Sequence, residues 1–360
     1  MFLVFLALGV LTLIVAGMTL APLLPIAHGA VRACEFPRLQ IMAVATLLAV
    51  VSLFLLPDPL AIGLLVVQGA VLLAQGYVCL RYTRLWRVQS LPFDGAGAAV
   101  FRMVAANVKM SNQRYDALID LLADQDPDLV ILVEVDAAWL AALAPIRERY
   151  PFVVEQPQDN AYGMALFSRL PLTDATVRFR LMEEVPSIRA SVETPDGQCF
   201  ALYVIHPEPP VPHADTLGRD GELILTAEDT KEDDLPAVVA GDLNDVAWSR
   251  STRRFQRLSG LLDPRVGRGF FNSFDARHRF MRWPLDHLFH DARFRVADLA
   301  RLPAIGSDHF PMLFALALLA EEASGETPEA ADADDAEEAA EVVAEAKTLD
   351  RKPIGSDWEK

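Results

Sequence analysis

The stretch VVAGDLND at residues 238–245 decides how the soluble part of this chain is expected to fold. The apolar residues before Gly241 are typical of a buried strand, and the glycine marks a sharp turn at the strand's end. Asp242 and Asn244 follow at once, and loops at strand ends are where many enzymes place their reactive groups. Gly, Asp and Asn are also the ordinary residues of a tight turn, so both interpretations stay open for this stretch alone.

The same pattern, a polar side chain at the end of an apolar run, recurs between residues 100 and 319. Singly, each such residue has a structural interpretation as a turn residue, a solvent-facing carboxylate, a packed imidazole or a cap. Together they favour a shared site, because a carboxylate at the end of a buried strand costs free energy unless it is paired or bound to a metal. The other members are Asn107 in FRMVAAN, Glu134 in LVILVEVD, His206 in CFALYVIHPEPP, Asp286 in WPLDHLFH, and Asp308 and His309 in IGSDHFPM.

Apolar strand-like runs alternate with helical patterns through this region. Helices are expected after residue 111 or 112, after residue 135, and over 215–229. Strands alternating with helices and followed by further strands indicate an α/β domain with sizeable sheets. The predicted strands are 100–108, 129–135, 163–168, 187–193, 199–206, 236–242, 284–290 and 309–318.

In this order, the motifs resemble the endonuclease/exonuclease/phosphatase superfamily. Its fold is shared by pancreatic-type deoxyribonucleases, apurinic endonucleases, neutral sphingomyelinases and inositol-polyphosphate phosphatases, and this chain is most similar to a membrane-anchored, bacterial-type branch. The resemblance runs from about Val100 to about Leu319 and is carried by AANV, LVEVD, YVIHPEPP, GDLND, PLDH and GSDHFP. It implies a four-layer α/β sandwich, with two packed mixed β-sheets flanked by helices.

The resemblance also implies a metal site. Glu134 would hold a divalent cation with Asn107 nearby, and Asp308 would touch a metal or support His309. The expected ion is Mg²⁺ or Mn²⁺, because hard cations prefer oxygen ligands and keep several waters, so few protein carboxylates suffice.

The remaining motif residues take catalytic roles by the same resemblance. Asp242 would orient or deprotonate the attacking water, and Asn244 would bind the phosphate or fix that geometry. His309 would donate a hydrogen bond to the phosphoryl oxygen, while Asp286 holds its imidazole in the right tautomer. His206 would act as the general acid for the leaving oxygen.

Other polar residues have weaker claims. We expect Asp245 to serve loop structure, His287 local packing, and His213 and His278 the surface. Residues 250–301 hold 12 arginines against 5 acidic residues, interleaved with aromatic side chains, which favours an anion-binding surface. The candidate substrate-binding residues are Arg189, Arg250 and Arg282.

Three long segments near the N-terminus carry no charged side chain. A spanning helix needs roughly 20 apolar residues, so these segments predict three transmembrane helices within a membrane anchor of residues 1–88. A signal peptide is the alternative for the first segment, but Met1 leads straight into Phe2 without a basic region. The predicted spans are about 2–24, 39–56 and 60–80.

Five arginines set the expected orientation. Arg32 and Arg38 lie between the first and second spans, and Arg81, Arg84 and Arg87 follow the third. Three spans place both groups on one side, and the positive-inside rule puts that side in the cytoplasm. The sequence therefore predicts a multi-pass inner-membrane protein with a cytoplasmic catalytic domain.

The segments on either side of the 100–319 domain differ in composition. We expect residues 89–99 to form a linker, in which Gly and Ala are concentrated in DGAGAA at 94–99. From Glu321 onward there are 14 acidic and 4 basic residues, so −10 of the net charge of −17 belongs to the tail. We expect residues 320–360 to be disordered, or in part a marginal solvated helix, because they lack large apolar side chains.

The sequence thus predicts a membrane-anchored, metal-dependent phosphoesterase. Its expected partners are the lipid bilayer and a lipid-linked or small phosphate, and no obligate protein partner is evident. A membrane-tethered nuclease is the main alternative. A membrane scaffold that lost catalysis is the third, although every motif residue that such a protein would be expected to lose is present.

Overall fold

Two β-sheets packed face to face form the centre of the computed structural model, which describes residues 2–320 and 327–358. The strands are β1 (Val100–Asn107), β2 (Leu129–Val133), β3 (Phe152–Gln156), β4 (Met164–Ser168), β5 (Leu172–Phe179), β6 (Pro186–Glu193), β7 (Cys199–Ile205), β8 (Ala237–Asp242), β9 (Asp286–His290), β10 (Phe294–Arg301) and β11 (Met312–Leu318). One sheet has the order β10-β11-β1-β2-β4-β3 and the other β5-β6-β7-β8-β9. Strands β1 and β2 are parallel, as are β7 and β8, and the other described neighbours are antiparallel, so both sheets are mixed.

The inner faces of the sheets meet in one apolar core. Phe101 of β1 stacks on Phe200 of β7 with ring centroids 5.1 Å apart, and Phe294 of β10 meets both rings edge-on. All three rings are fully buried. Because side chains alternate along a strand, the opposite faces carry a second set of apolar residues, which helices must cover.

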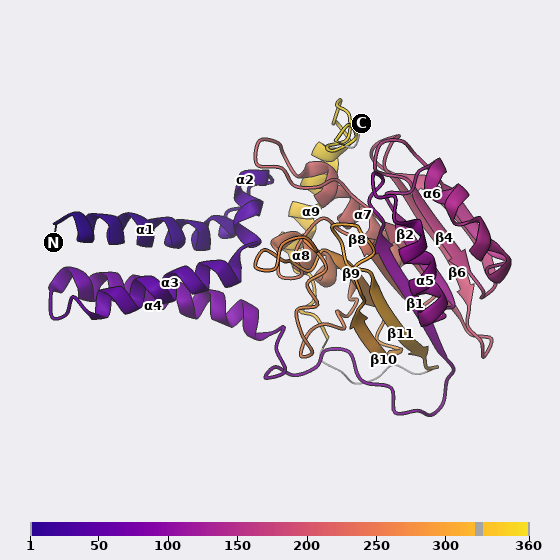
Figure 1. The fold of residues 1–360 in the computed structure, drawn as a ribbon, viewed down its shortest axis with the longest axis horizontal. Coiled ribbons are helices and arrows are strands. Elements are labelled where there is room, and N and C mark those ends of the chain that lie inside the picture. The colour runs from indigo at the N-terminus through magenta and orange to yellow at the C-terminus, as the bar shows by residue number, and fades with distance from the viewer. Residues whose placement is uncertain (1, 321–326, 359–360) are drawn as a thin grey trace.

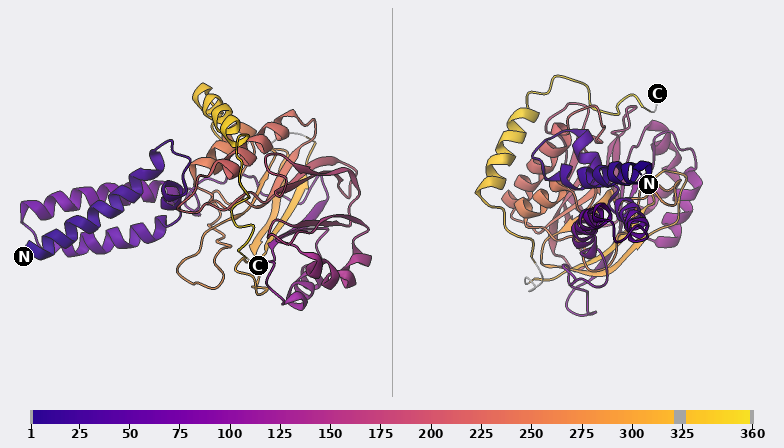
Figure 2. Two further views of the ribbon diagram at one scale, coloured as in Figure 1. Left: turned by 90° about the horizontal axis from the view of Figure 1, so that it is seen from above. Right: turned by 90° about the vertical axis from the view of Figure 1, so that its left-hand side faces the viewer.

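Helices cover the outer face of each sheet (Figures 1 and 2). Helices α5 (Tyr115–Gln125) and α6 (Ala137–Ala142) and the 3₁₀ helix η3 (Ala144–Arg149) pack on the first sheet. Helices α7 (Leu217–Glu232) and α8 (Arg250–Ser259) pack on the second. The predicted α/β sandwich of two mixed sheets with flanking helices is therefore confirmed.

Helices α1 (Phe2–Leu20), α3 (Arg38–Leu53) and α4 (Pro59–Leu80) project together from this domain (Figures 1 and 2). Among the described residues, two helical segments, Phe2–Leu23 and Pro59–Leu80, are long and apolar enough to cross a membrane. A third span exists only if Gly29–Glu35 and Arg38–Leu53 count as one segment across their 69° bend. The elements are α1 (Phe2–Leu20), η1 (Ala21–Leu23), α2 (Gly29–Arg32), η2 (Ala33–Glu35), α3 (Arg38–Leu53) and α4 (Pro59–Leu80).

Polar side chains lie inside this three-helix bundle, whereas many large apolar side chains are exposed on its outside. The Gln68 side-chain amide donates to Thr12 Oγ1 at 2.9 Å and to Ser52 Oγ at 3.3 Å, which ties α4 to α1 and α3. Gln75 accepts a hydrogen bond from Arg38 at 2.8 Å. Polar contacts between helices with an apolar exterior are typical of helices that pack within a bilayer.

The C-terminal tail contains a helix, which the sequence analysis allowed for in part, but this helix is packed on the domain rather than solvated. Residues 321–326 of that prediction lie outside the described residues, but α9 (Ala333–Ala346) is a helix that packs on α7 and α8. Its apolar face buries Val342 and Val343. Its acidic face meets the arginines of α8, where Arg257 binds the Asp335 carboxylate through two nitrogens at 2.7 and 2.5 Å. The acidic tail therefore has a basic partner, which composition alone did not reveal.

Candidate active site

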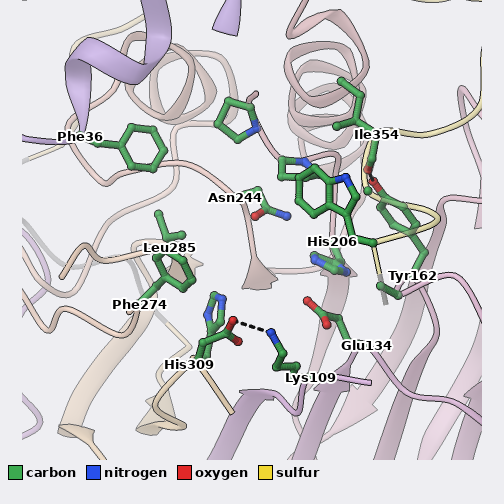
Figure 3. A pocket seen from close by; sticks show the side chains of 16 residues that line it. Phe36, Lys109, Glu134, Tyr162, His206, Asn244, Phe274, Leu285, His309 and Ile354 are labelled. Carbon is green, nitrogen blue, oxygen red and sulfur yellow. Dashed lines mark hydrogen bonds and ion pairs between the residues drawn. The ribbon is translucent and has the colours of Figure 1, made fainter. Parts of the chain in front are cut away.

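The sheet topology brings the polar strand ends to one place. Neighbouring parallel strands end at the same edge of a sheet, so Asn107 at the end of β1 and Glu134 directly after β2 lie close together. His206 after β7 and Asp242 at the end of β8 lie together in the other. Strand β9 runs antiparallel to β8 and pairs Asp286 directly with Asp242. Figure 3 shows the resulting cavity, with Glu134, His206 and His309 converging on it.

A single glycine permits the close approach of β7 and β8 at this edge. Gly241 has a φ of 145°, a conformation that side chains disfavour, and a Cβ there would lie 2.0 Å from the carbonyl oxygen of Ile205. Two non-glycine residues nearby, Glu134 and Asn244, also have positive φ values of 61° and 52°. Strained backbone of this kind is often found at functional sites.

The Asn107 side chain joins the two sheets. Its Nδ2 donates to Glu134 Oε1 at 2.7 Å and to Asp242 Oδ2 at 3.0 Å. Burial raises the pKa of Glu134 to about 7 and also raises the pKa of Asp242. Two buried carboxylates around one amide would be stabilised by a divalent cation, so these oxygen donors suit a hard metal ion.

A second group of ligand atoms surrounds Asp242. Single donor atoms of Asp242, Asp286 and His309 lie within 4.8 Å of one another, which is compact enough to hold a metal. His309 Nδ1, however, lies 2.7 Å from Asp286 Oδ2 in a close ion pair. Glu134 and Asp242 supply carboxylate oxygens, which Mg²⁺ or Mn²⁺ prefers. Asn107 turns its amide N–H groups toward them, while its Oδ1 accepts from the Lys109 backbone at 2.9 Å.

The two histidines of the site differ in charge: one is protonated and the other is neutral near pH 7. Burial alone would lower the pKa of His309, but the carboxylates of Asp286 and Asp242 raise it to about 10. His309 is therefore an imidazolium near neutral pH, and its Nε2 lies 3.4 Å from Asp242 Oδ2. Burial lowers the pKa of His206 to about 4, so this imidazole is neutral. Its Nδ1 has no hydrogen-bond partner among the described residues.

Asp308 lies at the cavity, but its charge is already balanced. Lys109 Nζ lies 2.8 Å from Asp308 Oδ2, and an Arg277 nitrogen lies 3.3 Å from the same oxygen. This pairing suits a supporting role better than metal ligation. The sequence reasoning missed Lys109, which lines the cavity (Figure 3). The only indication in the sequence was the position of Lys109 two residues after Asn107, and a single lysine there is typical of an ordinary loop.

The three arginines predicted to bind substrate do not line this cavity within the described part of the chain. Arg189 pairs with Asp233 at 2.7 Å, and Arg250 pairs with Glu338 of the tail at 2.6 Å. Arg282 lies over the Phe310 ring, at 4.9 Å from its centroid. Their substrate role stays a prediction, and their observed contacts are structural.

Two further polar residues have the structural contacts expected of them. Asp245 Oδ2 accepts a hydrogen bond from Ser249 Oγ at 2.6 Å. The His287 ring is buried between the Asp245 carbonyl, 2.8 Å from Nε2, and Arg265, 2.6 Å from Nδ1. His213 and His278 are exposed.

The cavity has a volume of about 290 Å³ and three kinds of wall. The polar floor consists of motif residues and Lys109. One apolar wall contains Phe36, from the segment that joins α2 to α3, beside Phe274 and Leu285. Another wall contains Ile354 and other residues near the C-terminus. The cavity therefore lies where the motif residues, the segment beside the apolar N-terminal helices and the tail meet.

Comparison with known proteins identifies the class. Residues 104–309 match the model of the endonuclease/exonuclease/phosphatase family, which is more than half of the chain, and the protein belongs to this family. Members of this superfamily are hydrolases that act on phosphoester bonds. None of the curated proteins with which the sequence was compared matches it.

Solved structures share the fold. Humanized D. rerio TDP2 carrying 14 mutations has a TM-score of 0.51 at 18% identity, over 60% of this chain and 98% of the other. D. rerio TDP2 complexed with a single-strand DNA product has a TM-score of 0.51 at 18% identity, over 61% of this chain and 99% of the other. An endonuclease/exonuclease/phosphatase from Bacteroides vulgatus has a TM-score of 0.50 at 18% identity, over 61% of this chain and 99% of the other. Identities this low show the fold alone.

The His309–Asp286 pair predicts a pH-dependent stability. Because Asp286, together with Asp242, raises the pKa of His309 from 6.5 to about 10, the stabilisation by the charged imidazolium is complete below pH 6.5 and is lost as the pH rises through 10. In metal-free protein, Asp286→Asn should therefore lower the free energy of unfolding more at about pH 6 than at about pH 10. Denaturant unfolding in excess chelator measures both differences.

The matched control is the same Asp286→Asn change in a His309→Gln background. There the effect of the substitution should lose its dependence on pH over this range. A pH-independent difference in the original background would contradict the assignment of a charged His309.

Proposed function

We propose that the protein is a membrane-anchored, divalent-metal-dependent phosphoesterase that acts on a lipid-linked or small phosphate. The observation that carries this proposal is one buried cluster in which Asn107 links Glu134 and Asp242 beside a charged His309. Family membership supports hydrolysis of a phosphoester, and the cluster supplies the groups that the reaction needs.

Glu134, with Asn107 and Asp242 beside it, would hold Mg²⁺ or Mn²⁺. When bound, the cation supplies charge neutralisation and polarises a phosphoryl oxygen. The raised pKa of Glu134 supports this role, because a carboxylate that burial disfavours in its charged form gains most from a cation.

Asp242 would orient the attacking water and accept its proton, for which its raised pKa is suited. Its Oδ1 accepts from the Asn244 backbone at 2.9 Å, which fixes the carboxylate and places the Asn244 side chain at the cavity, near the phosphate. His309 would donate from Nε2 to a phosphoryl oxygen, while Asp286 accepts from Nδ1 and fixes the orientation of the ring.

The general-acid role of His206 stays a prediction, and the low pKa of its buried imidazole adds a condition to it. A neutral imidazole has no proton to give as an imidazolium, so general acid catalysis requires the phosphate's negative charge to raise its pKa. Without that change, His206 is a neutral hydrogen-bond donor to the leaving oxygen.

The position of the cavity favours a substrate at the bilayer surface. Phe36 places one cavity wall directly beside the membrane-type helices. In the loop at 275–283, Phe280 is 85% exposed and Met281 54% exposed, and Gln40 at the start of α3 donates to the Phe280 carbonyl at 2.8 Å. This loop would meet the headgroup region, where exposed apolar and basic side chains bind lipid.

A nuclease is the second candidate, because one structural neighbour was solved with a single-strand DNA product. The arginine-rich segment, however, offers it little support. Arg250 and Arg257 of that segment pair with the tail, and Arg265 pairs with buried Asp263 at 2.9 Å. We therefore favour the lipid-linked or small phosphate.

We further propose three spans within residues 1–88, a linker at 89–99 and a catalytic domain at 100–319. Helix α3 has 16 residues, about 24 Å of rise, and needs the bent segment before it to reach both interfaces. The polar contacts of Gln68 with both α1 and α3 support a bundle in which all three helices are embedded. The positive-inside rule would then place the domain in the cytoplasm of an inner-membrane protein.

Activity of two site variants tests the function. In detergent with Mg²⁺, the full chain should hydrolyse a lipid pyrophosphate or bis-p-nitrophenyl phosphate. Asp242→Asn and His309→Ala should each lower kcat/KM by about 10²–10⁴, because each removes a group that acts in the transition state. Excess chelator should remove activity, and Mn²⁺ should restore it.

The matched control is His213→Ala, which removes an exposed histidine outside the cavity. It should retain wild-type rates. Near-wild-type activity in either site variant that still folds would overturn the assignment, and nicking of supercoiled DNA that disappears in Asp242→Asn would favour the nuclease.

Cysteine labelling tests the three spans. With Cys34→Ser and Cys79→Ser, exposed Cys199 remains as the domain's native probe, and Phe2→Cys provides a probe at the N-terminus. Three spans place these probes on opposite sides of the membrane, whereas two spans place them on the same side. An impermeant maleimide should label the Phe2→Cys probe in intact cells and Cys199 only after permeabilisation. Labelling of both before permeabilisation would contradict three spans.

A further inference from the structure

The C-terminal segment at 351–358, which we name the strap, lies against the active-site cavity. Ile354, Gly355 and Trp358 line the same cavity as Glu134 and the catalytic histidines. Figure 3 shows Ile354 on the side of the cavity where Tyr162 and His206 lie, opposite Phe36. Motifs for the site end at residue 309, so the strap is an addition from outside the matched domain.

The strap is held by a buried carboxylate. Glu208 is 2% exposed, and its two oxygens lie 2.5 and 2.9 Å from the Arg351 guanidinium. The Ile354 backbone N–H donates to Glu208 at 2.6 Å, and the Tyr162 hydroxyl donates to the Ile354 carbonyl. A buried carboxylate needs such partners, so this anchor fixes the path of the strap.

The anchor also connects the strap to a catalytic loop. Glu208 lies two residues after His206, and the Tyr162 ring that binds the strap lies 5.5 Å from the His206 ring. Pro209 and Pro210, next in that loop, line the cavity with the strap. The strap therefore contacts the residues that surround His206 rather than a remote surface.

The strap closes one side of a cavity whose other side is closed by Phe36 and Phe274. The cavity, with a volume of about 290 Å³ and a side open to solvent, suits a single phosphate-bearing group. A nucleic-acid backbone needs a groove that it can enter and leave, along which successive phosphates and bases lie.

We propose that the strap determines specificity: it admits a terminal or headgroup phosphoester and excludes a nucleic-acid strand from the catalytic residues. This inference rests on the phosphoesterase function proposed above and specifies its substrate class. The strap would exclude a nucleic-acid strand through a steric clash, and such clashes are a common source of substrate specificity.

The net charge of the strap allows its steric effect on nucleic-acid binding to be distinguished from an electrostatic effect. Residues 351–360 contain three basic and two acidic side chains, so their removal makes the chain more negative by one unit. On charge alone, a chain that lacks this segment would bind nucleic acid more weakly. Tighter binding after removal therefore reports the opening of the cavity.

Binding and turnover together test the proposal. The variants are deletion of 351–360, Arg351→Ala, which releases the anchor, and Trp358→Ala, which keeps the anchor and removes one wall residue. In an Asp242→Asn background, we expect the deletion and Arg351→Ala to bind a fluorescein-labelled single-stranded oligonucleotide at least about tenfold more tightly, as measured by anisotropy. Trp358→Ala should change binding in the same direction by a smaller factor.

The matched control is Lys347→Ala, which removes the same charge as Arg351→Ala from an exposed position at the end of α9. It should leave oligonucleotide binding unchanged. With Asp242 restored, the ratio of oligonucleotide cleavage to bis-p-nitrophenyl phosphate hydrolysis should rise at least about tenfold in the deletion and in Arg351→Ala.

The outcomes separate the two proposals. One outcome is that the strap variants hydrolyse bis-p-nitrophenyl phosphate with metal, but neither oligonucleotide binding nor the ratio of oligonucleotide cleavage to diester hydrolysis changes. This outcome would contradict the role of the strap and leave the proposed function supported. Tighter oligonucleotide binding without turnover of either substrate would support the strap and contradict the function. Efficient oligonucleotide cleavage by the wild-type chain would overturn the strap.

Discussion

The hydrogen bonds from Asn107 to Glu134 and Asp242 are the contacts on which the rest of the site depends. One amide has two hydrogens, and each is given to a carboxylate that ends a strand of a different sheet. This contact fixes the distance between the sheets at their common edge and keeps two acids close together where burial disfavours their charge. In the function we propose, this arrangement would favour binding of a cation and would make Asp242 a stronger base toward the attacking water.

Much of the fold could be predicted because its central strands are continuous apolar runs, the sequence pattern expected of strands that are buried on both faces. Three strands were missed, namely β3, β5 and β10, and each lies at the edge of its sheet. Strand β5 illustrates the reason: its residues are mostly exposed, so no apolar run separates it from a loop. The motif residues were located for the opposite reason, since polar groups stand out at the ends of buried strands.

Contacts between distant charges could not be read from the sequence. The arginine-rich segment was interpreted as an anion-binding surface and the acidic tail as disordered, yet Arg257 of α8 and Asp335 of α9 pair across about 80 residues of chain. Arg351 and Glu208 pair across a still longer separation and bring the tail to the cavity. The neutral state of His206 was missed as well, because it results from burial in the folded protein rather than from any sequence neighbour.

The most direct test of the central claim is calorimetric titration of metal-free protein with Mg²⁺, for the wild type, Glu134→Gln and the exposed-site control Glu148→Gln. Because the pKa of Glu134 is about 7, wild-type binding near neutral pH should release protons and tighten as the pH rises. Glu134→Gln should bind at least about tenfold more weakly and without that proton release, while Glu148→Gln matches wild type. Equal Mg²⁺ affinity in the wild type and Glu134→Gln would contradict the account.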